Sequence, residues 1–273
     1  GVRGLINVQF AFQDYRLYVL EVNPRGSRTV PFVSKATGVQ LAKLATRVIL
    51  GERVRDFHLP DRLVPEHVSV KEAVLPFDRF PGSDTRLGPE MKSTGEVMGI
   101  ADDFPTAFGK AHAAVGAPLP LEGSVFLSVC DSDKSAATIL AQRLHALGFT
   151  IYATRGTATA LTSLGIPVRV VNKVFQGEPH VVNLIAGGEV VLVINTPFGR
   201  SARSDGYEIR TAALERGIPS ITTLAGASAA VSAIEAARRP RVSVRCLQDL
   251  HATMGRAATD GPWPGMRSAE GAS

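Results

Sequence analysis

The sequence predicts an α/β fold in two parts, a β-hairpin with helices and short strands, followed by a parallel sheet with helices on both faces. Residues 5–23 hold two strand-like runs around a polar turn. From residue 124 to residue 237, short runs rich in Val, Ile and Thr alternate with helical patterns, as in successive βα units. Between these parts, residues 116–120 read Gly-Ala-Pro-Leu-Pro, which is typical of a linker.

Each element follows from the spacing of its apolar residues. Strands are expected where β-branched and aromatic residues run between turn residues, and helices where apolar residues recur every three to four positions. Five strands in the second part predict a five-stranded, parallel, doubly wound sheet. The expected strands are residues 5–12, 17–22, 68–76, 96–100, 124–130, 150–154, 168–171, 190–195 and 220–224. The expected helices are residues 39–50, 105–114, 134–147, 157–165, 180–186, 207–216 and 227–237.

The expected domains are residues 1–116 and 117–255. A tail over residues 256–273 is small, polar and rich in Pro and Gly, so we expect it to be disordered. The chain opens at Gly1 directly on strand-like sequence, without a basic and apolar leader. It therefore looks like a piece of a longer polypeptide that begins inside a domain.

Composition narrows the class of protein. Hydrophobic residues make up 45% and charged residues 20% of the 273, as in soluble globular proteins. No apolar run approaches the roughly 20 residues of a membrane helix. The net charge is +5, but the basic residues are dispersed and there is one Trp, so we expect small anionic ligands rather than nucleic acid. Cys130 and Cys246 lack CxxC spacing, which fits buried thiols in the cytoplasm.

The first candidate site lies on the hairpin. Because side chains alternate along a strand, Asn7 and Gln9 share one face of the first strand, and Glu21 and Asn23 share one face of the second. A three-residue turn at 14–16 would place Gln9 opposite Glu21 and Asn7 opposite Asn23. Carboxylate and amide oxygens together suit Mg²⁺.

Two arginines follow this strand. Arg25 and Arg28 stand where they can reach phosphates that share the cation. The ordinary alternative is an edge hairpin with a solvated polar face, and spacing alone leaves both open. The opposite face, expected to be the core side, carries Val8, Phe10, Leu20 and Val22.

The second candidate site lies at the carboxyl ends of the predicted parallel strands. Thr154 and Thr157 flank the point where a strand ends and a helix begins, and helix N-terminal amides with hydroxyls form anion sites. Lys134 follows the first strand of this sheet and Lys173 the third, so all four positions share one sheet edge. Taken singly, the threonines are also good helix caps and Lys134 a plausible surface charge.

Two long strings carry more than spacing, EVNPRGSRTVPFVSKATG at 21–38 and NVQF at 7–10. They resemble the end of the second ATP-grasp module in the carbamoyl phosphate synthetase large-subunit family. The resemblance continues through SVKEAVLPF at 69–77 and GPEMKSTGEVMG at 88–99. Residues 121–255 resemble its final, methylglyoxal-synthase-like regulatory domain, so nearly the whole chain is covered.

The resemblance implies roles for the hairpin residues. Gln9, Glu21 and Asn23 match metal ligands, for Mg²⁺ or Mn²⁺, in the module that phosphorylates carbamate with ATP. Arg25 and Arg28 match arginines near the phosphates and product. A potassium ion is a further expected cofactor. Most of the ATP-binding residues would precede Gly1, so this chain alone should not catalyse the reaction.

The resemblance also implies effector sites. Lys134, Thr154, Thr157, Lys173 and Asn195 match positions that bind a nucleotide monophosphate, UMP as inhibitor or IMP as activator. Glu72 and Thr222 match positions of an ornithine site where two domains meet. Pro197 departs from the hydroxyl residue frequent in relatives, which leaves the effector's identity open.

For the whole family, the resemblance implies synthesis of carbamoyl phosphate from bicarbonate, glutamine-derived ammonia and two ATP. This reaction serves arginine and pyrimidine biosynthesis in the cytoplasm. The implied partner is a glutamine amidotransferase small subunit, in an oligomer of heterodimers.

Other functions remain open at this point. A methylglyoxal-synthase-like lyase needs a carboxylate base beside its phosphate pocket. The segment KVFQGEPH at 173–180 lacks the Gly-Gly-Asp pattern of that enzyme, so Glu178 or Asp133 would have to substitute. His180 fits better as a helix-start residue. Another ATP-grasp ligase, such as a biotin carboxylase-like enzyme, fits the hairpin but not the regulatory-type domain. A pure binding module is the third possibility.

Overall fold

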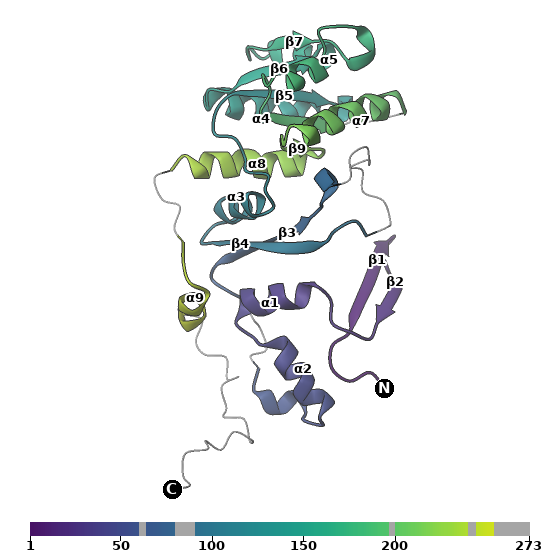
Figure 1. Ribbon diagram of the computed structural model, residues 1–273, viewed down its shortest axis with the longest axis vertical. Coiled ribbons are helices and arrows are strands. Elements are labelled where there is room, and N and C mark those ends of the chain that lie inside the picture. Colours follow the sequence, from purple (N-terminus) through teal and green to yellow (C-terminus); the bar gives the residue numbers. More distant parts are fainter. Residues whose placement is uncertain (60–63, 80–90, 197–199, 240–243, 254–273) are drawn as a thin grey trace. The chain divides into compact units, whose positions relative to one another are not determined.

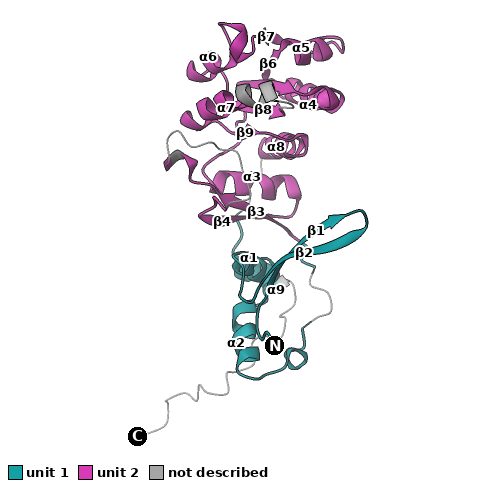
Figure 2. Ribbon diagram, turned by 90° about the vertical axis from the view of Figure 1, so that its right-hand side faces the viewer, with its two compact units in different colours: residues 1–66, 244–273 teal, residues 67–243 magenta. Residues whose placement is uncertain are grey.

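The computed structural model describes residues 1–59, 64–79, 91–196, 200–239 and 244–253, which group into two compact units. Unit 1 comprises residues 1–66 and the described residues from Val244 onward, and unit 2 runs from His67 to Ser243 (Figure 2). Residues 67–116 thus group with the sheet that follows them. The functional domains expected at 1–116 and 117–255 stay a prediction, and the tail at 256–273 lies outside the described residues.

Unit 1 begins with the predicted hairpin, β1 (Asn7–Gln13) and β2 (Arg16–Asn23). Its helices are α1 (Thr29–Thr37), α2 (Leu41–Ile49) and α9 (Leu247–Thr253), with a 3-10 turn at Val54–Phe57. Helix α2 was predicted, whereas α1 and α9 were not. Gly38 ends α1 with a φ of 75°, a left-handed conformation that glycine adopts without strain. A small core of Val39, Leu44 and Phe57 holds this unit.

The hairpin is exposed on the face that the sequence predicted to be its core side. Phe10 is 52% exposed, Leu20 62% and Val22 51%. That expectation was wrong for this chain, because a two-stranded ribbon cannot bury one of its faces without a packing partner.

The predicted parallel sheet forms within unit 2 (Figure 1). Its five strands lie in the order β7-β6-β5-β8-β9, and every pairing is parallel. This confirms the predicted fold class. The strands are β5 (Ser124–Val129), β6 (Thr150–Thr154), β7 (Arg169–Val171), β8 (Leu192–Thr196) and β9 (Ser220–Ile221).

Helices cover both faces of this sheet. On one face, α4 (Lys134–Ala146), α5 (Arg155–Thr162) and α8 (Leu224–Ala237) bury Val125 and Leu127. On the other, α6 (Val181–Ala186) and α7 (Arg200–Glu215) bury Phe126. The alternation of Val125, Phe126 and Leu127 between two cores is what a strand buried on both faces requires. Fully burying each such side chain contributes roughly 1.5–3 kcal/mol.

A smaller layer packs on α8. The antiparallel pair β3 (Val68–Val74) and β4 (Gly95–Ala101) carries α3 (Phe104–Ala114), and α3 contacts α8 (Figure 1). A 3-10 turn at Phe77–Arg79 follows β3. Strand and helix approach so closely that a Cβ on Gly99 would lie 1.9 Å from the carbonyl oxygen of Ala107. Among the described residues, no helix is long and apolar enough to cross a bilayer.

Candidate functional site

The hairpin brings the predicted metal-ligand residues together. Gln9 lies opposite Glu21 and Asn7 opposite Asn23, the pairing that the sequence predicted. The carboxamide nitrogen of Asn23 donates a 2.8 Å hydrogen bond to the carboxylate of Glu21. The polar face therefore holds one carboxylate beside amide groups from both strands.

This set fits a hard cation in part. Mg²⁺ prefers oxygen ligands, often one or two carboxylates with phosphate oxygens and water in the remaining positions. Glu21 is such a carboxylate, and Gln9 supplies an amide oxygen. Asn23 turns its nitrogen toward Glu21, so its amide must rotate to offer oxygen to a shared ion. Within the described ranges, no group of three or more His, Cys, Asp or Glu is arranged to hold a metal ion.

The two predicted arginines follow β2 on its connection to α1. The Arg25 guanidinium donates to the carbonyl of Gly26 at 3.1 Å, and Arg28 occupies the N-cap position of α1. Both stand on the segment that leaves the strand end carrying Asn23. Their proximity to phosphates stays a prediction.

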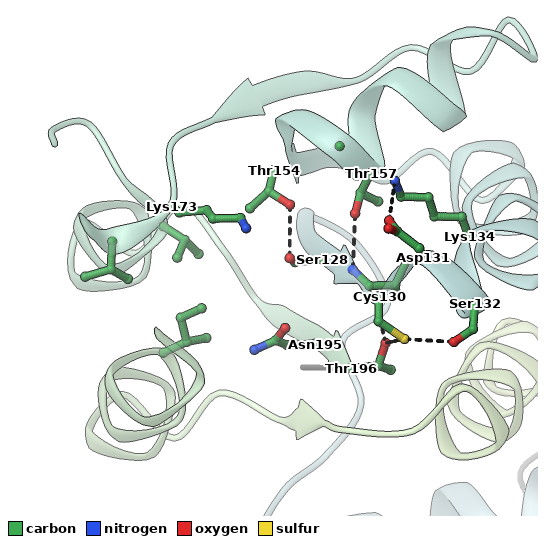
Figure 3. A pocket seen from close by; sticks show the side chains of 15 residues that line it. Ser128, Cys130, Asp131, Ser132, Lys134, Thr154, Thr157, Lys173, Asn195 and Thr196 are labelled. Carbon is green, nitrogen blue, oxygen red and sulfur yellow. Dashed lines mark hydrogen bonds and ion pairs between the residues drawn. The ribbon is translucent and has the colours of Figure 1, made fainter. Parts of the chain in front are cut away.

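The second set of predicted residues surrounds one cavity of about 550 Å³ (Figure 3). It lies at the carboxyl ends of β5, β6 and β8, next to the point where the strand order reverses, which is where open α/β sheets bind ligands. All five residues predicted to bind the nucleotide effector line it. They are Lys134, Thr154, Thr157, Lys173 and Asn195.

The two threonines join α5 to β5 rather than capping α5. Thr154 occupies the N-cap position, but its hydroxyl makes no cap hydrogen bond and instead lies 3.0 Å from the hydroxyl of Ser128. The Thr157 hydroxyl accepts a 3.1 Å hydrogen bond from the Val129 amide. The first amides of α5 therefore lack a side-chain cap, which leaves them able to bind an anion.

Asn195 is the clearest sign of a polar ligand. Its residue is only 6% exposed and lines the cavity at the end of β8. Its carboxamide makes no side-chain hydrogen bond to any part of the chain that the structure describes. The amide is therefore open to the cavity, where it can bind water or the polar atoms of a ligand.

Two ammonium groups supply positive charge. Lys134 lies over the first turn of α5, where Gly156 leaves room: a Cβ there would be 3.5 Å from the Lys134 nitrogen. Lys134 also forms a 2.7 Å ion pair with Asp131. This hydrogen bond, with the nearby charge of Lys173, holds the pKa of Asp131 below its ordinary value. Lys173 enters from the turn after β7, with its nitrogen 5.9 Å from the Phe175 ring centre.

One wall of the cavity is apolar. Val174, Val181 and Ile209 line it, on the segments after β7 and on α6 and α7. A ligand that fits both parts has an anionic group, hydrogen-bonding atoms and a less polar body. A phosphate monoester of a nucleoside has these properties.

Several lining residues were not predicted from the sequence. Ser128, Cys130, Asp131, Ser132 and Thr196 also face the cavity. Their positions at strand ends could have identified them from the sequence. Residues 128–132 lie at and just after the end of β5, and Thr196 follows Asn195 at the end of β8.

The residues predicted for an ornithine site do not line this cavity. Glu72 lies in β3 opposite Val97, and Thr222 is exposed between β9 and α8. Their joint role stays a prediction. Pro197 lies outside the described residues.

Comparison with known families matches both parts of the chain. Residues 1–57 match the family model described as carbamoyl-phosphate synthase L chain, ATP binding domain. Residues 136–222 match the family model of the MGS-like domain.

Whole-chain relatives agree. Carbamoyl phosphate synthase large chains from Archaeoglobus fulgidus and Methanothermobacter thermautotrophicus are each 51% identical over 92% of this chain, and the Halomonas eurihalina large chain is 52% identical over 92%. The chain belongs to the carbamoyl phosphate synthase large-chain family. It spans about a quarter of the length of these relatives, 23% of the first and 24% of the other two.

Membership of the large-chain family bears on the alternatives. The similarity to carbamoyl phosphate synthase large chains extends over 92% of this chain, which counts against another ATP-grasp ligase. Neither Glu178 nor Asp133 lines the cavity, and His180 is the N-cap residue of α6. Neither residue therefore supplies the carboxylate that a lyase needs, and Asp131, which does line the cavity, is paired with Lys134.

Proposed function

We propose that this chain forms part of a carbamoyl phosphate synthase large chain and binds a nucleotide monophosphate effector in the cavity of unit 2. The observation that carries the proposal is the lining of this one cavity, which holds two lysines, the Asn195 carboxamide and the uncapped start of α5. The phosphate binds Lys134, Lys173 and the first amides of α5. The base packs against Val174, Val181 and Ile209. UMP as inhibitor and IMP as activator are the proposed effectors.

Isothermal titration calorimetry of the whole chain with UMP and with IMP tests this proposal. Either nucleotide should bind with a dissociation constant below the millimolar range, and Lys173→Met should weaken binding at least tenfold. Lys110→Met is the matched control, because Lys110 donates to the Ile100 carbonyl in the β4–α3 layer and does not line the cavity. Absence of binding at millimolar nucleotide would contradict the proposal. Ornithine, tested separately with Glu72→Gln and Thr222→Val, addresses the second effector site.

For unit 1, we infer that the hairpin supplies ligands and charge for phosphorylation of carbamate by ATP. A Mg²⁺ or Mn²⁺ ion held there would supply positive charge against the negative charge that develops during phosphoryl transfer. Glu21 and Gln9 would hold it, with Asn23 after rotation of its amide. Arg25 and Arg28 would orient phosphate oxygens and exclude water from the transferred group.

Glu21→Gln tests the metal role in a full-length large chain that carries this segment. The change keeps the shape of the side chain and removes its charge, so Mn²⁺ binding measured by paramagnetic resonance should weaken. Carbamate phosphorylation should fall, while glutamine hydrolysis remains measurable. Glu52→Gln is the control, since Glu52 pairs with Arg47 at the end of α2. Unchanged Mn²⁺ binding in Glu21→Gln would reject the assignment.

The remaining functions follow from the family. We propose the full protein to be a cytoplasmic ATP-dependent ligase that uses bicarbonate and ammonia, with potassium as a further cation. Its ammonia would come from a glutamine amidotransferase small subunit, in an oligomer of heterodimers that serves arginine and pyrimidine biosynthesis. This chain without the rest of the large chain should not form carbamoyl phosphate. Assaying it alone with ATP, bicarbonate and ammonia tests that last point, and dihydroxyacetone phosphate as substrate tests the lyase alternative.

A further inference from the structure

The mouth of the cavity carries an internal ion pair that involves one of its phosphate-binding groups. Asp131 belongs to a 3-10 turn, Asp131–Asp133, which directly precedes α4, and its carboxylate lies 2.7 Å from the Lys134 ammonium (Figure 3). The Asp131 side chain is 94% exposed, whereas that of Lys134 is 30% exposed. The carboxylate thus stands in solvent, and the ammonium it binds lies at the cavity wall.

Lys134 stands where a positive charge needs a counter-ion. It packs over Gly156 in the first turn of α5, at the positive end of that helix. Lys173 adds a second positive charge to the same cavity. In this structure the negative charge beside Lys134 comes from Asp131.

The neighbouring carboxylate has a different set of partners. Asp133 accepts a 3.3 Å hydrogen bond from Ser132, and the hydroxyl of Thr196 is the main cause that lowers its pKa. Asp133 does not line the cavity. Among the described lining residues, Asp131 therefore holds the only negative charge, against the positive charges of Lys134 and Lys173.

We propose that Asp131 is a built-in competitor of the effector phosphate for Lys134, and that it raises the effector concentration at which this domain responds. The inference rests on the proposed phosphate site. The phosphate and the Asp131 carboxylate are both anionic and compete for the N–H donors of Lys134, and the exposed carboxylate can turn away from the ammonium. A side chain that is almost fully exposed can do this without loss of packing, so the competition costs affinity but not stability.

A double-mutant cycle on the whole chain tests the proposal. Dissociation constants for inorganic phosphate and UMP are measured by NMR titration at low ionic strength, for wild type, Asp131→Asn, Lys134→Gln and the double variant. Asp131→Asn should bind about two- to fivefold more tightly, the range expected from removing one exposed ion pair. In the Lys134→Gln background the same change should have no effect. The gain in the wild-type background should shrink as salt rises, because salt screens exposed charges.

Glu122→Gln is the matched control. Glu122 is exposed and lies just before β5, whereas Asp131 lies just after it, so the change removes the same charge at the opposite end of the strand. Its affinity for phosphate should equal that of wild type, and the unfolding free energy of every variant should stay within about 1 kcal/mol of wild type, the most that an exposed ion pair contributes. If Asp131→Asn matches Glu122→Gln, or its gain persists without Lys134, the competition does not exist. If wild type binds neither phosphate nor UMP, the proposed effector site itself is wrong.

Discussion

Gln9 and Glu21 lie directly opposite each other in the hairpin, although the turn between their strands is shorter than the sequence suggested. The turn consists of two residues, Asp14 and Tyr15, with φ of 49° and 60°. The register shifts between Gln9 and Phe10, because Leu20 on the other strand has no partner. A two-residue turn and one bulge restore the pairing that a three-residue turn would give, and the polar residues end on one face by this route.

The turn itself predicts a stabilising change. Both central residues adopt left-handed φ, the geometry of a type I′ turn, which favours Asn-Gly. Replacing Asp14 and Tyr15 by Asn and Gly should stabilise the hairpin by about 0.5–1 kcal/mol. Amide hydrogen exchange of β1 and β2 measures it. Tyr15→Ala is the control, since it removes the ring contact with Phe12 but keeps the strained φ; equal protection in both variants would contradict the turn assignment.

Elements with a local sequence pattern were predicted correctly. The five parallel strands could be predicted because runs of β-branched residues alternate with segments of helical periodicity. Helix α1 was not, since Pro31 and the β-branched residues of TVPFVSKAT have low helix propensity, and its contacts decide its conformation. The exposed hairpin face was misjudged because sequence alternation identifies an apolar face but not what covers it.

Some residues of the candidate site could be predicted from the sequence and others could not. Residues at the carboxyl ends of strands were predictable because topology brings those ends together. Asp131 was not, because its contact with Lys134 depends on a 3-10 turn that sequence periodicity does not reveal. Asn195 was predicted by resemblance, but only the structure shows that its amide shares a cavity with Lys134 and Lys173.

Asn195→Leu should separate stability from binding. The amide faces the cavity and makes no side-chain hydrogen bond among the described residues, so an apolar side chain of similar volume should leave the free energy of unfolding nearly unchanged. Affinity for UMP should fall at least tenfold, because the ligand loses its partner. Urea unfolding and calorimetry measure the two effects.

Thr157→Val is the contrasting variant for Asn195. It leaves the Val129 amide without its hydroxyl acceptor and should destabilise by roughly 1–3 kcal/mol. If Asn195→Leu destabilised the protein as much as Thr157→Val, the Asn195 amide would have a structural partner and the ligand argument would fail.

Gly99→Ala should be among the most damaging small changes in unit 2. Its Cβ would overlap the Ala107 carbonyl at 1.9 Å, and both partners are backbone, so β4 and α3 would have to separate. We expect a loss of roughly 3 kcal/mol or more, as for severe overpacking. Gly109→Ala is the matched control on α3: its Cβ would meet Ala233 at an ordinary 3.5 Å, and the change improves helix propensity. Thermal unfolding of both variants measures the contrast.

The ion pair between α4 and α8 predicts a pH dependence of stability. Arg143 binds the Glu235 carboxylate through two hydrogen bonds of 2.9 and 2.8 Å, and this lowers the pKa of Glu235 below its ordinary value of 4.5. Because the folded state has the lower pKa, the pair stabilises the fold above pH 4.5, and this stabilisation disappears as pH falls through the folded pKa. The difference in unfolding free energy between wild type and Glu235→Gln should therefore be largest at neutral pH and shrink toward pH 3. Urea titrations across that range measure it, with Glu122→Gln as the control of equal charge; a difference that does not change with pH would mean that the pair contributes through packing and not through its charge.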